Sequence, residues 1–172
     1  MAFQIIIDGY NLIRNFAPLA RAEKIDFSRG RETLLDWLSS YRQKTNQPIL
    51  VVFDGAGKGG LGEERDFYKG IRVLYSKAGQ TADEIIKRTV AKEREKALVV
   101  TSDLELGTYC RTQKAGWIRS QDFAQRVQTR IINLEKGIPE DDDPEPHGQK
   151  KKGAALRLSK RDRQERRYWE KI

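Results

Sequence analysis

Short apolar runs bounded by polar or turn-forming residues recur along the chain at intervals that suit β-strands. Most positions in these runs are hydrophobic, which is typical of strands buried on both faces of a parallel sheet. The sheet is therefore expected to lie inside the domain, with helices on both sides. We predict five strands, at Phe3 to Ile7, Ile49 to Phe53, Ile71 to Tyr75, Ala97 to Thr101 and Trp117 to Arg119.

Helical patterns fill most of the intervals between these strands. Apolar residues from 34 to 41 recur on one helical face, and Asp26 or Ser28 is available as the N-cap. Residues 81 to 84 have the pattern of a capping box, which opens a helix. Further helices are predicted from Ser102 to about Lys114 and after Ser120. Strands that alternate with helices predict an α/β fold with a mostly parallel central sheet.

Acidic residues stand where several of these strands end. Asp8 ends the first strand, Asp54 the second, and Asp103 follows the fourth. Because ligands of open α/β sheets bind outside the carboxyl ends of the strands, these three side chains are expected at one edge. Asp83, in the first turn of a predicted helix, is expected to reach the same edge, since the helix dipole favours its negative charge there.

Carboxylates that lie close together raise one another's pKa unless a cation binds between them. Oxygen ligands of this kind suit Mg²⁺ or Mn²⁺, and a metal that keeps some of its water can activate it to attack a phosphodiester. A purely structural role stays open for each aspartate, because Asp is common after strands and at helix starts. Asp122, two residues after Ser120, is also explained as a first-turn helix acid.

Four motifs occur in a fixed order: "DGYNLI", "VVFDG", "TADEII" and "VVTSD". Together they resemble the NYN branch of the PIN-like nucleases, and specifically its YacP-like group, over about residues 3 to 135. The resemblance implies a PIN-like three-layer α/β domain and a divalent-metal-dependent endoribonuclease. It also implies RNA as the partner, because YacP-like members are associated with ribosomes and messenger RNA decay.

The resemblance further implies roles for individual residues. Asn11 is expected to support Asp8, and many PIN-like nucleases carry a fourth acid near the last strand, a position for which only Asp122 is available here. One metal ion or two therefore both stay open. The implied catalytic residues are Asp8, Asn11, Asp83 and Asp103, the implied metal ligands are Asp8, Asp83 and Asp103, and the candidates for an additional site are Asp54, Ser102 and Asp122.

The charge distribution points to a polyanionic partner. The net charge is +8 and the isoelectric point is about 9.6. Residues 150–172 hold ten Lys or Arg against three Asp or Glu, which is nearly all of the excess. We predict a nuclease domain over 1–136, an acidic linker over 137–149 and a basic tail over 150–172, helical from about Leu156.

The tail is predicted to bind RNA phosphates, with Tyr168 or Trp169 either stacking on a base or anchoring the tail on the domain. The loop "GAGKGG", residues 55 to 60, is predicted to be mobile and to lie with nearby cations beside the substrate. The candidate RNA-binding residues are Lys58, Arg65, Lys69, Lys150, Lys151, Lys152, Arg163, Arg166, Arg167 and Trp169.

Several other classes fit the sequence less well. The glycine-rich loop lacks an acid at the end of the next strand and a Ser or Thr after Lys58, which argues against a dinucleotide or Walker site, and no organic cofactor is expected. A single cysteine and the absence of a long apolar stretch predict a cytoplasmic protein without a membrane span. The main alternative to an enzyme is a non-catalytic RNA- or ribosome-binding module on the same fold.

Overall fold

A six-stranded sheet runs through the centre of the computed structural model, which describes residues 3–55, 62–137, 166–170 and 172. The strand order is β3-β4-β2-β1-β5-β6, and every neighbouring pair is parallel except β3 with β4. The strands are β1 (Gln4–Asp8), β2 (Ile49–Phe53), β3 (Glu64–Tyr68), β4 (Ile71–Tyr75), β5 (Ala97–Val100) and β6 (Gly116–Ile118). The predicted α/β fold with a mostly parallel sheet is confirmed.

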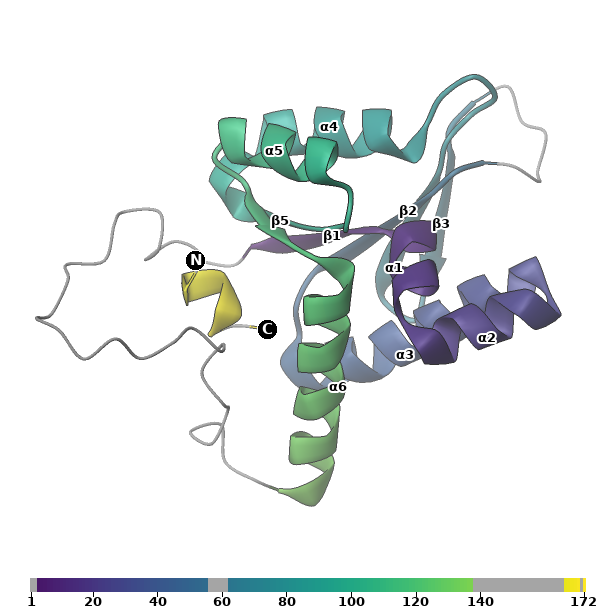
Figure 1. The fold of residues 1–172 in the computed structure, drawn as a ribbon, viewed down its shortest axis with the longest axis vertical. Coiled ribbons are helices and arrows are strands. Elements are labelled where there is room, and N and C mark those ends of the chain that lie inside the picture. Colours follow the sequence, from purple (N-terminus) through teal and green to yellow (C-terminus); the bar gives the residue numbers. More distant parts are fainter. Residues whose placement is uncertain (1–2, 56–61, 138–165, 171) are drawn as a thin grey trace, which may run out of the picture.

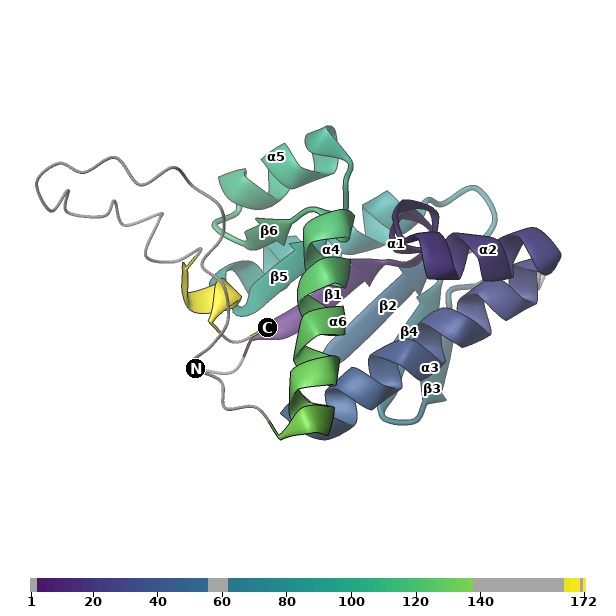
Figure 2. The ribbon, with the colours of Figure 1, turned by 60° about the horizontal axis from the view of Figure 1, so that its bottom comes forward.

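Helices cover both faces of this sheet (Figure 1). Helices α4 and α5 pack on one face, while α1, α3 and α6 pack on the other and α2 lies against α3 (Figure 2). No helix in the described ranges combines the length and the apolar character that crossing a bilayer requires. The helices are α1 (Gly9–Asn15), α2 (Ala17–Ile25), α3 (Phe27–Thr45), α4 (Ala82–Glu93), the short 3-10 helix η1 (Arg94–Lys96), α5 (Leu104–Thr112) and α6 (Ser120–Lys136).

The alternation of side chains along β1 explains why three consecutive residues in its middle, Ile5 to Ile7, are all apolar. Ile5 and Ile7 are buried in the core beneath α1, α3 and α6, and Ile6 is buried in the second core beneath α4 and α5. A strand that faces two cores needs an apolar residue at every position. The same holds for β2 and β5, all of whose residues are buried.

The helix ends follow the predicted capping chemistry. Of the two candidate caps for α3, Asp26 is the one used, because its carboxylate accepts a hydrogen bond from the backbone N–H of Ser28. Thr81 and Glu84 form the predicted capping box at the start of α4. That box fixes the first turn of α4, which carries Asp83 to the carboxyl edge of the sheet.

Strand β3, helices α1 and α2 and the 3-10 helix η1 were not predicted, and β3 changes the expected place of two cations. Strand β3 is polar and lies at the edge of the sheet, antiparallel to β4. Arg65 belongs to this strand and not to a loop. Lys69 lies in the turn before β4, at the opposite end of the strands from Asp8, and its Nζ is 2.6 Å from Asp36 Oδ1. The expectation that Lys69 lies near the substrate is therefore wrong, whereas Lys58 lies outside the described residues.

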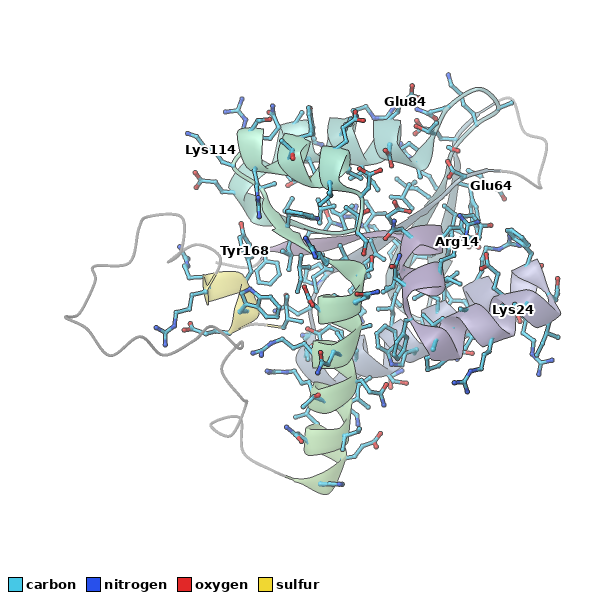
Figure 3. The ribbon with its side chains drawn as sticks, in the orientation of Figure 1. Arg14, Lys24, Glu64, Glu84, Lys114 and Tyr168 are labelled. Atoms are coloured by element: carbon cyan, nitrogen blue, oxygen red, sulfur yellow. The ribbon has the colours of Figure 1, made fainter. Side chains whose placement is uncertain are left out.

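The C-terminal end of the chain packs on the domain (Figure 3). Tyr168 is only 6% exposed, and its ring meets Phe3 edge-on with centroids 5.1 Å apart. Its hydroxyl donates to the backbone carbonyl of Glu95 at 2.7 Å. Ile172 is buried as well, and its carbonyl accepts a hydrogen bond from the Tyr41 hydroxyl at 3.1 Å. Of the two predicted roles for this end, anchoring on the domain is the one observed.

Trp169 joins the same contact. It is partly buried against the core, and the Arg126 guanidinium lies 5.6 Å from its ring centroid. This packing agrees with the anchoring role, while contact of Trp169 with RNA stays a prediction. Arg166 and Arg167 are exposed at the surface. The predicted linker beyond Gly137 and four of the predicted RNA-binding residues lie outside the described residues: Lys150, Lys151, Lys152 and Arg163.

Candidate active site

Asp8 ends β1 and at the same time caps α1. Its Oδ1 accepts from the backbone N–H of Asn11 at 3.4 Å, and its Oδ2 accepts from the Thr101 hydroxyl at 3.4 Å. Burial raises the pKa of Asp8 to about 7, and the charges of Asp83 and Asp54 add to that rise, while the two hydrogen bonds oppose it. Ionisation of Asp8 is therefore unfavourable in the folded protein, and a bound cation would make it more favourable.

The negative charges of Asp83 and Asp54 act on Asp8, and those of Asp103 and Asp54 act on Asp83. Burial raises the pKa of Asp83, and Asp103 and Asp54 raise it further, while Lys87 opposes the rise. Asp103 caps α5 by accepting from the N–H of Leu106 at 3.0 Å. Asp54 accepts from the N–H of Ala82, the first residue of α4, at 2.6 Å. The four aspartates thus lie at the carboxyl edge of the sheet where they were expected, and three of them also have a structural role as hydrogen-bond acceptors.

The donor set fits a hard divalent cation. All four side chains offer carboxylate oxygens, and the pKa values of Asp8 and Asp83 are raised by the same negative neighbours that a cation would neutralise. Within the described ranges, no group of three or more His, Cys, Asp or Glu side chains forms a ready-made metal centre. Mg²⁺ is commonly held by one or two carboxylates with water at its other positions, which is the kind of binding that this edge permits.

Asn11 holds the loops around Asp8 together. Its side-chain Oδ1 accepts from the backbone N–H of Ser102 at 2.8 Å and from the hydroxyl of Ser120 at 2.7 Å. The Ser102 hydroxyl in turn accepts from the N–H of Ser120 at 3.3 Å. Helix α1 is thereby tied to the segment after β5 and to the start of α6. This geometry agrees with the supporting role expected for Asn11 and gives Ser102 a place in the same network.

Two residues of the network were missed by the sequence reasoning. Thr101 is fully buried, donates to Asp8 and accepts from the N–H of Asp103 at 3.2 Å. Ser120 is also fully buried. The only signal for both is a hydroxyl side chain at the carboxyl end of an apolar run. Asp122, by contrast, is exposed in the first turn of α6, and the main causes of the raised pKa values of Asp8 and Asp83 do not include it.

Replacing Asn11 with Ala is expected to destabilise the fold. The change leaves the Ser102 N–H and the buried Ser120 hydroxyl without their acceptor. An unmade buried hydrogen bond costs about 1–3 kcal/mol, so we expect a loss of about 3 kcal/mol in the free energy of unfolding, measured with urea. Asn15→Ala, which removes only donors to Asn11, is the matched control and should cost less than about 1 kcal/mol. Equal losses in the two variants would contradict the assignment.

The chain is similar both to a family of domains and to an individual protein. The family model of the YacP-like NYN domain matches residues 5–172. The uncharacterized protein YacP of Bacillus subtilis (strain 168) is 29% identical over 84 residues, a match that spans about half of each protein, 49% of this chain and 49% of YacP.

Solved structures agree with the fold. The crystal structure of Rae1 (YacP) from Bacillus subtilis superimposes with a TM-score of 0.64 at 24% identity, covering 80% of each chain. A mutant of that protein gives a TM-score of 0.65 at 23% identity, covering 78% of this chain and 80% of the other. At this level of identity the likeness concerns the fold alone.

Proposed function

The chain belongs to the YacP-like NYN domain family, which is of the nuclease type, and on this premise we propose that it is a divalent-metal-dependent endoribonuclease. The observation that carries the proposal is the cluster of four aspartates, of which Asp8 and Asp83 have raised pKa values. A site that must hold a phosphodiester and water beside several carboxylates needs a cation to balance their charge.

In this proposal Asp8, Asp83 and Asp103 hold a Mg²⁺ or Mn²⁺ ion. The bound ion would supply an activated water and neutralise the charge that develops on the leaving oxygen. The Thr101 hydroxyl fixes one oxygen of Asp8 and the backbone of Asp103, so that the two carboxylates keep their relative positions. Asn11 fixes the segments on which Ser102 and Ser120 lie. Asp54 lies at the rim and holds the start of α4.

RNA is the proposed substrate, and a role on ribosomes in messenger RNA decay remains a prediction from the family resemblance. The exposed Arg166 and Arg167 and the cations of residues 150–165 are proposed to contact RNA phosphates. For single-stranded RNA, each neutralised phosphate adds about −0.7 to the slope of log K against log salt. The tail's contribution to binding can therefore be measured as a change in that slope.

We expect the purified protein to cut RNA with Mn²⁺ or Mg²⁺ and to stop in EDTA, leaving 5′-phosphate and 3′-hydroxyl ends. Attack by water on the phosphorus, opposite the 3′ oxygen as leaving group, produces those ends. End-group analysis of a labelled RNA distinguishes them from other products. A 2′,3′-cyclic phosphate would mean that the ribose hydroxyl attacked, and RNA binding with no cleavage under any metal condition would favour the non-catalytic alternative.

A further inference from the structure

A large aromatic side chain is exposed beside α1, the helix that Asp8 caps. Phe27, the first residue of α3, is 53% exposed. Its ring meets the Tyr10 ring in an edge-to-face arrangement, with ring centroids 5.5 Å apart and planes inclined at 61°. Tyr10 itself is buried and lies in the first turn of α1, two residues after Asp8. The exposed ring is thus supported from below by the helix that Asp8 caps.

The support continues as a row of rings along the carboxyl edge of the sheet. Tyr10 contacts Phe53 with centroids 5.1 Å apart, and Phe53 stacks on Tyr75 at 5.6 Å. Phe53 and Tyr75 are the last residues of β2 and β4 and are partners in register. Gly9 allows the start of α1 to lie close to the Phe53 ring, since a Cβ at that position would lie 2.3 Å from the ring. The row is therefore fixed in place, and Asp54 follows directly after one of its members.

Two guanidinium groups contact Tyr10. The Arg31 Nη1 donates to the Tyr10 hydroxyl at 3.0 Å, and its Nη2 donates to the Ser28 hydroxyl at 3.2 Å. Arg14, on α1 (Figure 3), lies over Tyr10 with its guanidinium carbon 5.5 Å from the ring centroid. The Arg14 side chain is 61% exposed, and its nearest approach to Glu23 is a long 3.9 Å. Positive charge thus adjoins an exposed ring at the edge where the four aspartates meet.

We propose, on the basis of the proposed function above, that Phe27, Arg14 and Arg31 form a subsite for single-stranded RNA. One base stacks on the exposed part of the Phe27 ring, and the two guanidinium groups hold the adjoining phosphate. Base stacking on an aromatic ring tolerates any sequence, because every base has a π-face, and cations beside it bind the backbone. Bases within a duplex are already stacked on their neighbours, so the subsite selects unpaired RNA.

Binding of a fluorescein-labelled single-stranded oligoribonucleotide to the full chain in EDTA tests the subsite without cleavage. Phe27→Ala should weaken binding roughly tenfold, in line with the loss of one stacked base. Phe27→Trp should bind as tightly as wild type, and Phe27→Leu, which keeps apolar area without a π-face, should be as weak as Phe27→Ala. Ile25→Ala is the matched control, because Ile25 is 69% exposed at the same helix junction and has no ring. It should bind like wild type.

The outcomes separate this subsite from the nuclease proposal. If wild type cuts RNA but Phe27→Ala and Ile25→Ala bind it equally well, the subsite is wrong and the nuclease stands. Full affinity in Phe27→Leu would likewise overturn stacking, as would equal weakening by Phe27→Ala and Ile25→Ala, which is the pattern of an apolar contact. If wild type neither binds nor cuts RNA, the proposed function itself fails. Thermal melting of each variant identifies any loss of RNA affinity that comes from unfolding. If Phe27→Ala is unfolded, the affinities of Phe27→Trp and Phe27→Leu decide whether the ring stacks on a base.

Discussion

Replacing Asp8 with Asn is expected to abolish RNA cleavage and to make the metal-free protein more stable at about pH 8. Burial is the main reason why the pKa of Asp8 rises from 3.8 to about 7. In the folded state the ionised form is therefore disfavoured relative to the unfolded chain. Asn keeps the size of the side chain and one acceptor oxygen but removes the charge. The free energy of unfolding of the metal-free protein should therefore increase, while the proposed metal ligand is lost.

The pH dependence has a definite sign. Between about pH 4 and pH 7 the folded protein keeps a proton on Asp8 that the unfolded chain releases, so stability falls as the pH rises through this window. A pKa shift of this size corresponds to a loss of roughly 4 kcal/mol in the free energy of unfolding, reached in full above about pH 7. The pKa of Asp83 is also raised and acts in the same direction. Asp36 and Glu63 have lowered pKa values, so the stability they contribute is lost only as the pH falls through their lower range.

Urea unfolding in EDTA at about pH 5 and pH 8 measures this effect. Wild type should be clearly less stable at the higher pH, whereas Asp8→Asn should lose most of that difference and keep the part due to Asp83. Mn²⁺ should stabilise wild type by binding the folded state, and it should have little effect on Asp8→Asn. Asp66→Asn, at an exposed position of the edge strand β3, is the control and should behave like wild type. An Asp8→Asn protein that cuts RNA within a few-fold of wild type would refute the assignment.

The sheet could be predicted from the sequence because each central strand faces two cores. That requirement produces uninterrupted apolar runs, which are visible without any structure. Strand β3 could not be predicted in the same way, since it lies at the edge and its Glu64–Tyr68 sequence is mostly polar. Helix α1 is only seven residues long, too short to show a helical period. Helix α2 has a single buried residue, Leu19, so it also lacks an apolar face in the sequence.

The candidate site was predictable only in part, for a related reason. Three aspartates lie at or shortly after the ends of strands, and parallel strands bring such residues to one edge whatever the details of packing. The contact of Thr101 with Asp8 depends on the pairing of β1 with β5, in which Ile7 is the partner of Val100. The contact of Phe27 with Tyr10 depends on where α3 begins relative to α1. Neither spatial relation leaves a pattern within a single stretch of sequence.

Replacing Tyr168 with Ala is expected to destabilise the whole domain, although this residue is more than thirty positions beyond α6. The Tyr168 ring is 6% exposed, contacts Phe3 at the start of the chain, and covers Gly116 in β6, where a Cβ would lie 2.6 Å from the ring. Truncating a buried aromatic residue to Ala costs about 3–5 kcal/mol. For a chain of this size the melting temperature should fall by about 10 °C.

Two further variants show how much of the stability lost in Tyr168→Ala comes from packing of the ring, from its hydrogen bond and from nearby charge. Tyr168→Phe removes only the hydroxyl that donates to the Glu95 carbonyl and should cost about 1 kcal/mol, whereas Arg167→Ala, at the exposed position beside it, should change little. A Tyr168→Ala protein that melts with wild type would show that the C-terminal contact adds no stability. If the contact is as strong as its burial suggests, deleting residues 150–172 removes part of the core together with the basic charge. RNA binding by the tail is then tested properly by neutralising its Lys and Arg residues while Tyr168 and Ile172 stay in place.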